Sequence, residues 1–282
     1  TTWVNSYKYS FTYDANNNQT EQISQNWSGS VWTNSYRYLS TYNSNNKTTL
    51  ERYQSWNGTT WVDNSRYVYT YDANRNAIQY DYQTWSGTAW VNYFRYSSAY
   101  NANNKVTEQI SSNWDGTAWV NTNRYTFTYD ANNNQTEYLY QTWDVSVWKN
   151  NFRYSYSYNS NNDITQLTTQ SWDGAVWVNN DKYTLTYDAR YNRTEILGQI
   201  WDVAVWKNSY KDSYLYDAND NRTQYIYQSW DGSVWVNQDR SLITYVAGHY
   251  QTSITLNTSY TFDDPTKTTS YQIIGLPGAN NL

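Results

Sequence analysis

This chain has no cysteine, no methionine, one histidine and two prolines among its 282 residues. Without cysteine it has no disulfide and no thiol nucleophile, and His249 alone cannot supply the usual Cys and His ligands of zinc. No nucleophile-elbow or phosphate-loop motif occurs, and the carboxylates recur evenly along the chain, whereas an active site is usually unique. The sequence therefore predicts that the protein is not an enzyme, with no catalytic residues, cofactor or metal.

Aliphatic residues are also scarce. Leu, Ile, Val and Phe make up 43 of the 282 residues, a fraction that on composition alone is typical of disorder. The 34 tyrosines and 17 tryptophans reverse that expectation, because each ring can bury roughly 150–250 Å². No apolar run approaches the roughly 18 residues of a membrane span, so we expect none.

Charge and termini narrow the class of protein further. The formal net charge is −5 and the basic residues are dispersed, so we expect no nucleic-acid partner. The chain has neither methionine nor a signal peptide, which indicates an N-terminus that is processed or excerpted. The lack of cysteine in a chain rich in Tyr, Trp, Asn and Thr favours an extracellular or cell-surface location.

What the chain has in abundance is repetition, because all 17 tryptophans fall on two series with a 29-residue spacing. The first series is Trp3, Trp32, Trp61, Trp90, Trp119, Trp148, Trp177, Trp206 and Trp235, and the second is Trp27, Trp56, Trp85, Trp114, Trp143, Trp172, Trp201 and Trp230. This spacing indicates about nine tandem units, each completed by its neighbours. We expect the repeat array to occupy residues 1–246, and residues 247–282, where the period fails, to form a cap or the start of a further module.

The fifth unit shows how one repeat is predicted to fold. Residues 119–129 alternate with period two, which places Trp119, Tyr125 and Phe127 on one face of a strand and Arg124 on the other. The Asx-rich residues 130–134 favour a turn that tolerates left-handed backbone. A second strand follows over residues 136–143. Each unit is therefore predicted to be an antiparallel pair of strands.

Successive units are joined by a Trp-x-Gly-x-x-Trp link, as in residues 27–32. With Ser28 and Gly29 as a two-residue loop, the two tryptophans are predicted to be diagonal neighbours on one face. Two links carry Val145 and Val203 in place of this glycine. Because a β-branched residue disfavours positive φ, we expect a different turn there.

A weaker period of 58 residues overlies the first. The fifth strand position is aromatic in Tyr36, Phe94, Phe152 and Tyr210, and polar in Ser65, Asn123, Asp181 and Asp239. This alternation is explained either by gene duplication in pairs or by two facing layers of hairpins in which large side chains meet small ones. The fold prediction is an all-β, elongated, solenoid-like or coiled-sheet array, with a facing or coiled arrangement favoured over a lone flat sheet, which would leave aromatic surface exposed to water.

Two recurring sets of polar residues are candidate binding sites. A basic residue occupies the sixth strand position of every unit, predicted to lie opposite the Trp face: Lys8, Arg37, Arg66, Arg95, Arg124, Arg153, Lys182, Lys211 and Arg240. This row is interpreted as a solvated row that pairs with carboxylates, and alternatively as a stripe for an acidic polysaccharide. The loops that begin at Asp14, Asp72, Asp130 and Asp217 resemble the start of a calcium loop but lack its glycine and its final glutamate, so Asx turns are expected.

The segments Tyr71-Asp-Ala-Asn-Arg-Asn76 and Tyr216-Asp-Ala-Asn-Asp-Asn-Arg-Thr223 resemble the Tyr-Asp signature of the YD/Rhs repeat family, in which Tyr-Asp-x-x-Gly-x opens a turn between strands. The match recurs across residues 1–223, in a longer unit with another residue at the family's glycine. The chain also resembles Tyr/Trp-rich repeats of secreted surface proteins of Bacteroidetes-type bacteria. These resemblances imply β-strand ribbons in large surface or toxin-delivery proteins.

Three functions are compatible with this pattern. The first is a non-enzymatic extracellular repeat that serves as a surface stalk, scaffold or adhesin segment. The second is a filament subunit, whose open strand at residues 3–13 pairs with the edge of another copy. The third is a glycan-binding module that uses exposed Trp and Tyr rings. The expected partners are therefore the chain itself, head to tail, or surface glycans.

Overall fold

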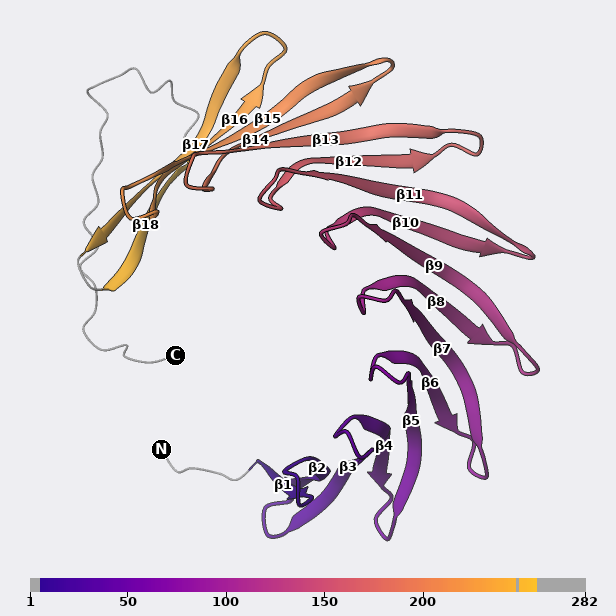
Figure 1. Cartoon of the computed structure of the whole chain (residues 1–282). Helices are drawn as coiled ribbons and strands as arrows, with labels where there is room; N and C mark the ends of the chain where they lie inside the picture. The colour runs from indigo at the N-terminus through magenta and orange to yellow at the C-terminus, as the bar shows by residue number, and fades with distance from the viewer. Residues whose placement is uncertain (1–5, 247–248, 258–282) are drawn as a thin grey trace. The chain divides into compact units, whose positions relative to one another are not determined.

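The computed structural model describes residues 6–246 and 249–257, and in these ranges the chain forms strands and no helix (Figure 1). The chain divides into two units, Thr1–Asn151 and Phe152–Leu282. Trp3 and most of the predicted cap or further module, residues 247–248 and 258–282, lie outside the described residues. No helix in the described ranges is long and apolar enough to cross a membrane.

The first unit holds ten complete strands and the beginning of an eleventh. They are β1 (Tyr7–Tyr13), β2 (Gln19–Trp27), β3 (Trp32–Tyr42), β4 (Thr48–Trp56), β5 (Trp61–Tyr71), β6 (Ala77–Trp85), β7 (Trp90–Tyr100), β8 (Val106–Trp114), β9 (Trp119–Tyr129), β10 (Gln135–Asp144) and β11 (Val147–Tyr158). From β1 to β10, each strand is antiparallel to the next one along the chain.

The second unit is a meander of the same kind. After the remainder of β11 it contains β12 (Ile164–Trp172), β13 (Trp177–Tyr187), β14 (Arg193–Asp202), β15 (Val205–Tyr216), β16 (Arg222–Trp230), β17 (Trp235–Val246) and β18 (His249–Asn257). Each is antiparallel to its neighbour in sequence, including β18, which pairs with β17 beyond the last clear repeat. The prediction of an all-β array of tandem antiparallel hairpins is confirmed.

Within each unit the described strands form a single layer, because each strand packs beside its sequence neighbours and not over a second sheet. Of the two arrangements left open, two facing layers are therefore not found within either unit. Few large side chains are fully enclosed, and the buried hydrophobic residues among those described are Tyr214 and Ile243. Stability must come from contacts between side chains on neighbouring strands, which are the unit of stabilisation in any sheet.

A β-bulge near the start of the first strand of each repeat reverses the alternation of side chains. In the β8–β9 pair, Ser111 lies opposite Asn123 and Ser112 opposite Asn121, so Thr122 is an extra residue. The same shift recurs at the fourth strand position, at Ser35, Asn64 and Tyr93 in the first unit and at Asn180, Ser209 and Gln238 in the second. An extra residue changes which face the following side chains occupy.

The prediction that Trp119, Tyr125 and Phe127 share a face is consequently wrong. Tryptophan and the basic residue of the sixth position lie on one face, hereafter the Trp face. The tyrosines and phenylalanines that follow lie on the opposite one, hereafter the Tyr face. A second bulge, occupied by threonine in most repeats, lies near the start of the second strand of each repeat. It exchanges the faces again, so that the next tryptophan lies on the Trp face.

The glycine links are longer loops than the sequence suggested. Trp27 lies directly opposite Trp32, and the Ser28 amide donates to the Val31 carbonyl oxygen at 3.0 Å, so the loop has four residues. The prediction of a two-residue loop with diagonal tryptophans is wrong for these links. Gly29 adopts φ 93°, which explains the glycine.

The two valine links do form a different turn, as predicted. In the second unit Asp202 lies opposite Val205, which leaves a two-residue loop of Val203 and Ala204. Val203 nevertheless adopts φ 55°, and so does Val145 in the corresponding link of the first unit. The valines therefore change the loop length without avoiding the left-handed backbone.

At several positions of the 58-residue alternation a large side chain lies opposite a small one within the sheet, whereas Phe94 lies opposite Tyr82 and Asn123 lies opposite Ser111. At the fifth strand position, Tyr36 lies opposite Ser24, and Tyr210 lies opposite Gly198. Where this position holds Ser65, the residue opposite is Tyr53. A Cβ added at Gly198 would lie 2.4 Å from the Tyr210 ring, so this pair has no room for two side chains.

Candidate functional site

A pair of tryptophans closes each link between repeats. The two rings lie on directly opposed residues, with centroids 5.1 Å apart for Trp27 and Trp32. Tilted or edge-to-face rings at this separation stabilise by about 0.5–1.5 kcal/mol beyond the area they bury. The other pairs, with centroids 4.8–5.2 Å apart, are Trp56–Trp61, Trp85–Trp90, Trp114–Trp119, Trp143–Trp148, Trp172–Trp177, Trp201–Trp206 and Trp230–Trp235.

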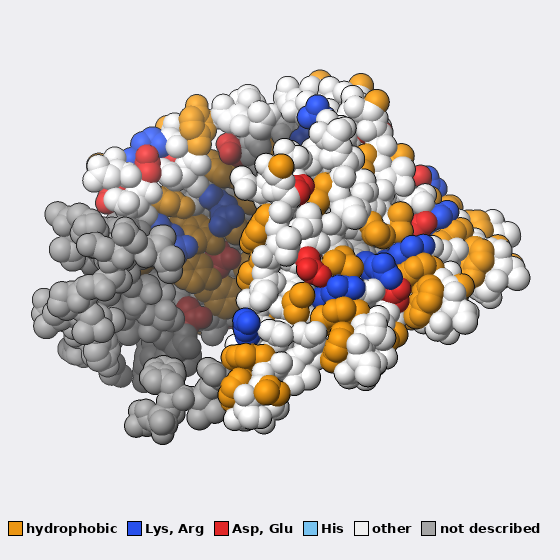
Figure 2. All heavy atoms as spheres, turned by 90° about the horizontal axis from the view of Figure 1, so that it is seen from below, with side chains coloured by type: hydrophobic (Ala, Val, Ile, Leu, Met, Phe, Trp, Pro, Cys, Tyr) orange, Lys and Arg blue, Asp and Glu red, His pale blue; other side chains and the backbone are white. Residues whose placement is uncertain are grey.

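The predicted cationic row lies on the Trp face and not opposite it. The Arg95 guanidinium lies 4.4 Å from the ring centre of Trp119, 24 residues further along the chain. The same contact joins Arg37 to Trp61, Arg66 to Trp90, Arg124 to Trp148, Arg153 to Trp177, Lys182 to Trp206 and Lys211 to Trp235. In Figure 2, Lys and Arg side chains accordingly lie among hydrophobic ones. Each basic residue thus packs against the link of the next repeat.

Carboxylates and amides complete the environment of these cations. Arg95 donates to both carboxylate oxygens of Asp81, at 2.7 and 2.8 Å. Arg37 bonds Gln54 through Nε and Glu21 through Nη1. At the ends of the row, Lys8 is exposed and Arg240 donates to Gln224 at 2.9 Å. Carboxylates therefore pair with some of these cations, and amide oxygens accept hydrogen bonds from others.

A row of amide pairs, which sequence reasoning missed, crosses the Trp face beside the tryptophans. The Gln25 side-chain NH₂ donates to the Asn34 side-chain oxygen at 2.9 Å. The same bond joins Gln83 to Asn92, Gln141 to Asn150, Gln170 to Asn179, Gln199 to Asn208 and Gln228 to Asn237. The signal was present as a fixed Gln-x₈-Asn spacing, which the bulge converts into a cross-strand pair.

The turn at the other end of each hairpin is an Asx turn, as predicted. Asp130 Oδ1 accepts from the backbone amides of Asn132 and Asn134, both at 2.9 Å, and Oδ2 accepts from the Asn134 side chain. That side-chain hydrogen bond is the main cause that lowers the pKa of Asp130, and the equivalent bond has the same effect at Asp14, Asp72 and Asp217. The described residues hold no group of three His, Asp or Glu side chains placed to share a metal ion.

The tyrosine before this aspartate reaches back to the preceding repeat. The Tyr71 hydroxyl donates to the Thr48 carbonyl oxygen at 2.7 Å, across 23 residues. The same bond joins Tyr42 to Gln19, Tyr100 to Ala77, Tyr129 to Val106, Tyr187 to Ile164 and Tyr216 to Arg193. The Tyr-Asp motif thus has two functions: tyrosine ties neighbouring repeats together, and aspartate forms the turn.

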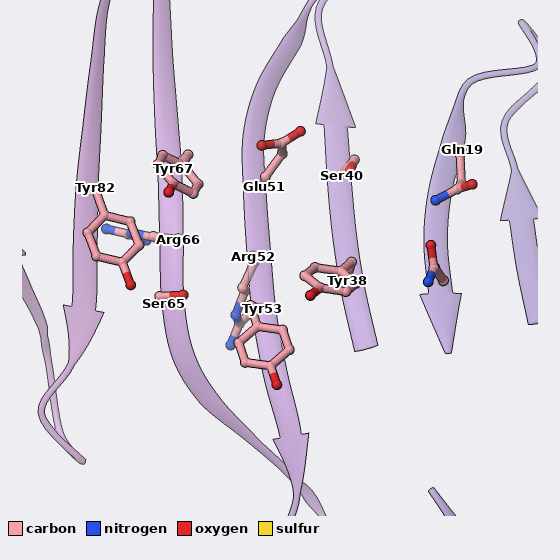
Figure 3. Close-up of a pocket in the computed structure, with 11 residues that line it drawn as sticks. Gln19, Tyr38, Ser40, Glu51, Arg52, Tyr53, Ser65, Arg66, Tyr67 and Tyr82 are labelled. Atoms are coloured by element: carbon pink, nitrogen blue, oxygen red, sulfur yellow. The ribbon is translucent and has the colours of Figure 1, made fainter. Parts of the chain in front are cut away.

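The Tyr face of the first unit carries a pocket of about 470 Å³. Ser65 lies at its base between Tyr53 on β4 and Tyr67 and Tyr82 on β5 and β6 (Figure 3). Glu51 and Ser40 lie at one end of it. Sequence reasoning missed this site because Ser65 looked like one member of an alternating series.

No protein-family model and no curated protein matches the chain. Its structure is similar to part of TcdB2-TccC3 without its hypervariable C-terminal region, at 12% identity over 88% of this chain and 15% of that chain, with a TM-score of 0.41. A DUF3836 family protein from Bacteroides vulgatus is 22% identical over 36% of this chain and 87% of its own, with a TM-score of 0.23. A porin-like protein from Bacteroides uniformis is 13% identical over 88% of this chain and 92% of its own, with a TM-score of 0.30. We therefore infer function from the contacts within this chain.

Proposed function

We propose that the chain is a non-enzymatic, extracellular structural repeat that serves as a spacer within a surface stalk, scaffold or adhesin. The observation that carries this proposal is that the recurring side chains contact the neighbouring repeats. Tyr71 bonds the backbone of the repeat before it, at Thr48, and Arg66 packs on Trp90 of the repeat after it. A residue kept in every repeat for a ligand would instead be directed away from such contacts.

The turns add a third connection between repeats. The Asn76 side chain donates to the Asn104 side-chain oxygen at 2.9 Å, and Asn18 donates to Asn46 at 3.1 Å. Side-chain contacts thus join one turn to the next along the array, and the number of repeats sets the length of the array. A spacer needs this property, because its span must change by a fixed amount when a unit is added or removed.

The roles of tyrosine and aspartate also support the resemblance to YD repeats. Arg75, at the place where that motif carries glycine, adopts φ 68°. This is the left-handed backbone that glycine would provide without strain. We propose on this basis that the repeat is a YD-like variant with a longer unit.

The proposal is tested by removing one repeat between two distance probes. Because the chain has no cysteine, spin labels can be attached at Val31→Cys and Ala118→Cys, two exposed loop positions three repeats apart. Deleting residues 61–89 joins Thr60 to Trp90 and preserves the link between tryptophans. The label distance should fall by about 10 Å, the width of two strands.

A matched deletion in the second unit provides the control. Removing residues 177–205 takes out one repeat that lies outside the labelled segment, so the label distance should stay unchanged. Unfolding of the 61–89 deletion, or an unaltered distance in it, would refute a modular spacer. Assembly of the intact chain into filaments under negative-stain microscopy would favour the filament alternative instead.

A further inference from the structure

The pocket on the Tyr face arises where a small residue of the 58-residue alternation is surrounded by tyrosines. Ser65 is a small side chain at the fifth position of β5, and Tyr53 lies directly opposite it on β4. Tyr67 follows two residues later on the same face, opposite Tyr82 on β6. Three aromatic rings therefore surround a residue too short to fill the space between them, as Figure 3 shows.

The corresponding positions in other repeats do not have these surroundings. Asn123 lies opposite Ser111 instead of a tyrosine, and the Tyr140 hydroxyl bonds the Asn123 side chain at 2.7 Å. Asp181 lies opposite Thr169, whose hydroxyl donates to its carboxylate at 3.1 Å. Asp239 does lie opposite Tyr227, but Ser241 stands two residues later where the Ser65 repeat has Tyr67. Among the described repeats with a small or polar residue at this position, Ser65 alone has tyrosine opposite it, two residues after it and opposite that second residue.

The aromatic walls belong to two ring clusters on either side of Ser65. The centroids of Tyr38 and Tyr53 are 5.0 Å apart on one side, and those of Tyr67 and Tyr82 are 4.9 Å apart on the other. Rings held by such contacts lose little further freedom when a ligand packs against them. The walls are therefore preorganised for a flat ligand with apolar faces.

Polar groups line the remainder of the pocket. Glu51 is held by the Tyr69 hydroxyl, which donates to Oε2 at 2.7 Å. Gln22, Ser40 and Ser65 supply further donors and acceptors. The carboxylate of Glu51 disfavours an anionic ligand, and the guanidinium of Arg52 is bonded to Asp63. A ligand with apolar ring faces and several neutral hydroxyl groups satisfies both kinds of wall.

We propose that the Ser65 pocket binds a neutral carbohydrate, with a pyranose ring between the two tyrosine clusters and its hydroxyls bonded to Glu51 and Ser65. The C–H faces of a pyranose carry partial positive charge and pack on the electron-rich faces of tyrosine rings. The pocket volume of about 470 Å³ lies within the range of small-molecule sites. This site is independent of the spacer function, because the combination of Ser65 with its three surrounding tyrosines does not recur in the other described repeats.

The test measures binding of the full chain to a panel of neutral disaccharides, namely maltose, cellobiose, lactose and chitobiose, by calorimetry and saturation-transfer NMR. We expect binding of at least one of them. Ser65→Phe places an aromatic ring in the pocket and reproduces the phenylalanine that stands at the equivalent position of the next repeat, Phe94. It should weaken that binding by about tenfold or more. The matched control is Asn123→Phe, which introduces phenylalanine at the equivalent position two repeats later and should leave binding unaltered.

A second variant keeps the test decisive if Ser65→Phe does not fold. Tyr82→Ser removes one wall and reproduces the serine found at the equivalent Ser111, and it should also weaken binding. Circular dichroism confirms the fold of each variant. The proposal is overturned if no disaccharide of the panel binds the intact chain at millimolar concentration. It is equally overturned if folded Ser65→Phe or Tyr82→Ser binds as tightly as the parent, or if Asn123→Phe loses binding to the same extent.

Discussion

At the scale of single residues, ten residues other than glycine in the described part of the chain adopt positive φ, and each lies in a turn. Asn tolerates this backbone, and five of these positions carry it. Val145 and Val203 do not belong to this tolerant class, because a β-branched side chain clashes with its own backbone in the left-handed region. Both valines are more than nine-tenths exposed, so no packing compensates for the strain.

We predict that Val145→Gly stabilises the protein. The substitution removes a left-handed cost of about 1–2 kcal/mol, partly offset by the entropy that glycine adds to the unfolded chain. The net gain should be about 0.5–1 kcal/mol, measured as a higher midpoint of urea unfolding.

The reverse change provides the control. Gly29→Val places valine at φ 93° in the corresponding position of another link, and it should lower the midpoint. A neutral or destabilising Val145→Gly would mean that the valine link does not hold positive φ in solution.

At the scale of elements, the number and type of strands follow from sequence, but the faces they present do not. Period-two alternation and Asx-rich turns locate the hairpins, since they reflect local backbone preferences. The bulge has no recognisable sequence signature, because its position is occupied by different residue types in successive repeats: Ser35, Asn64, Tyr93 and Thr122. A bulge accepts any residue that can lie unpaired at the surface.

The predicted faces are wrong for the residues that follow the bulge, because one extra residue exchanges the two faces of the strand. Arg124 was therefore predicted on the face opposite the tryptophans, although it lies on theirs. The Ser65 pocket was unpredictable for a related reason. It depends on Tyr53, Tyr67 and Tyr82, whose proximity is fixed by strand register and not by spacing along the chain.

The pairing of β14 with β15 gives the clearest test of large-to-small matching between strands. Gly198→Ala would place Cβ 2.4 Å from Tyr210 Cε1, so the ring must move from its position. We predict a loss of about 1–3 kcal/mol in the free energy of unfolding, as for overpacking elsewhere. Chemical denaturation would measure it.

A double variant separates the clash from the loss of glycine itself. In Gly198→Ala with Tyr210→Ser, the added methyl group no longer meets a ring. The two substitutions should therefore interact favourably in a double-mutant cycle. Additive effects would show that Tyr210 does not lie over Gly198.

At the scale of the whole molecule, a single-layer sheet depends on tyrosines that are apolar over the ring and polar at the hydroxyl. Burial raises the pKa of Tyr210 from 10.0 to about 12. Burial and a hydrogen bond to Glu51 raise the pKa of Tyr69 further above the ordinary value. A phenolate at Tyr71 or Tyr129 could not donate to the carbonyl of the preceding repeat.

We predict that the fold is stable at neutral pH and unfolds in alkali. For a group whose folded pKa is raised, the stabilisation is fully present below the unfolded pKa, near 10, and is lost as pH rises through the folded pKa, about 12 for Tyr210. Circular dichroism and tyrosinate absorbance should therefore change together in this window. Unfolding that begins well below pH 10, where free tyrosine is still protonated, would contradict this account.

The contacts between a basic residue and the tryptophan 24 residues later also give the array a direction, so that its two ends differ. Each repeat offers a cation to one neighbour and an indole to the other, so that its two sides are complementary and not alike. Copies of this unit can be added in one orientation only. Inverting a single repeat would leave two cations facing each other at one junction and two indoles at the other.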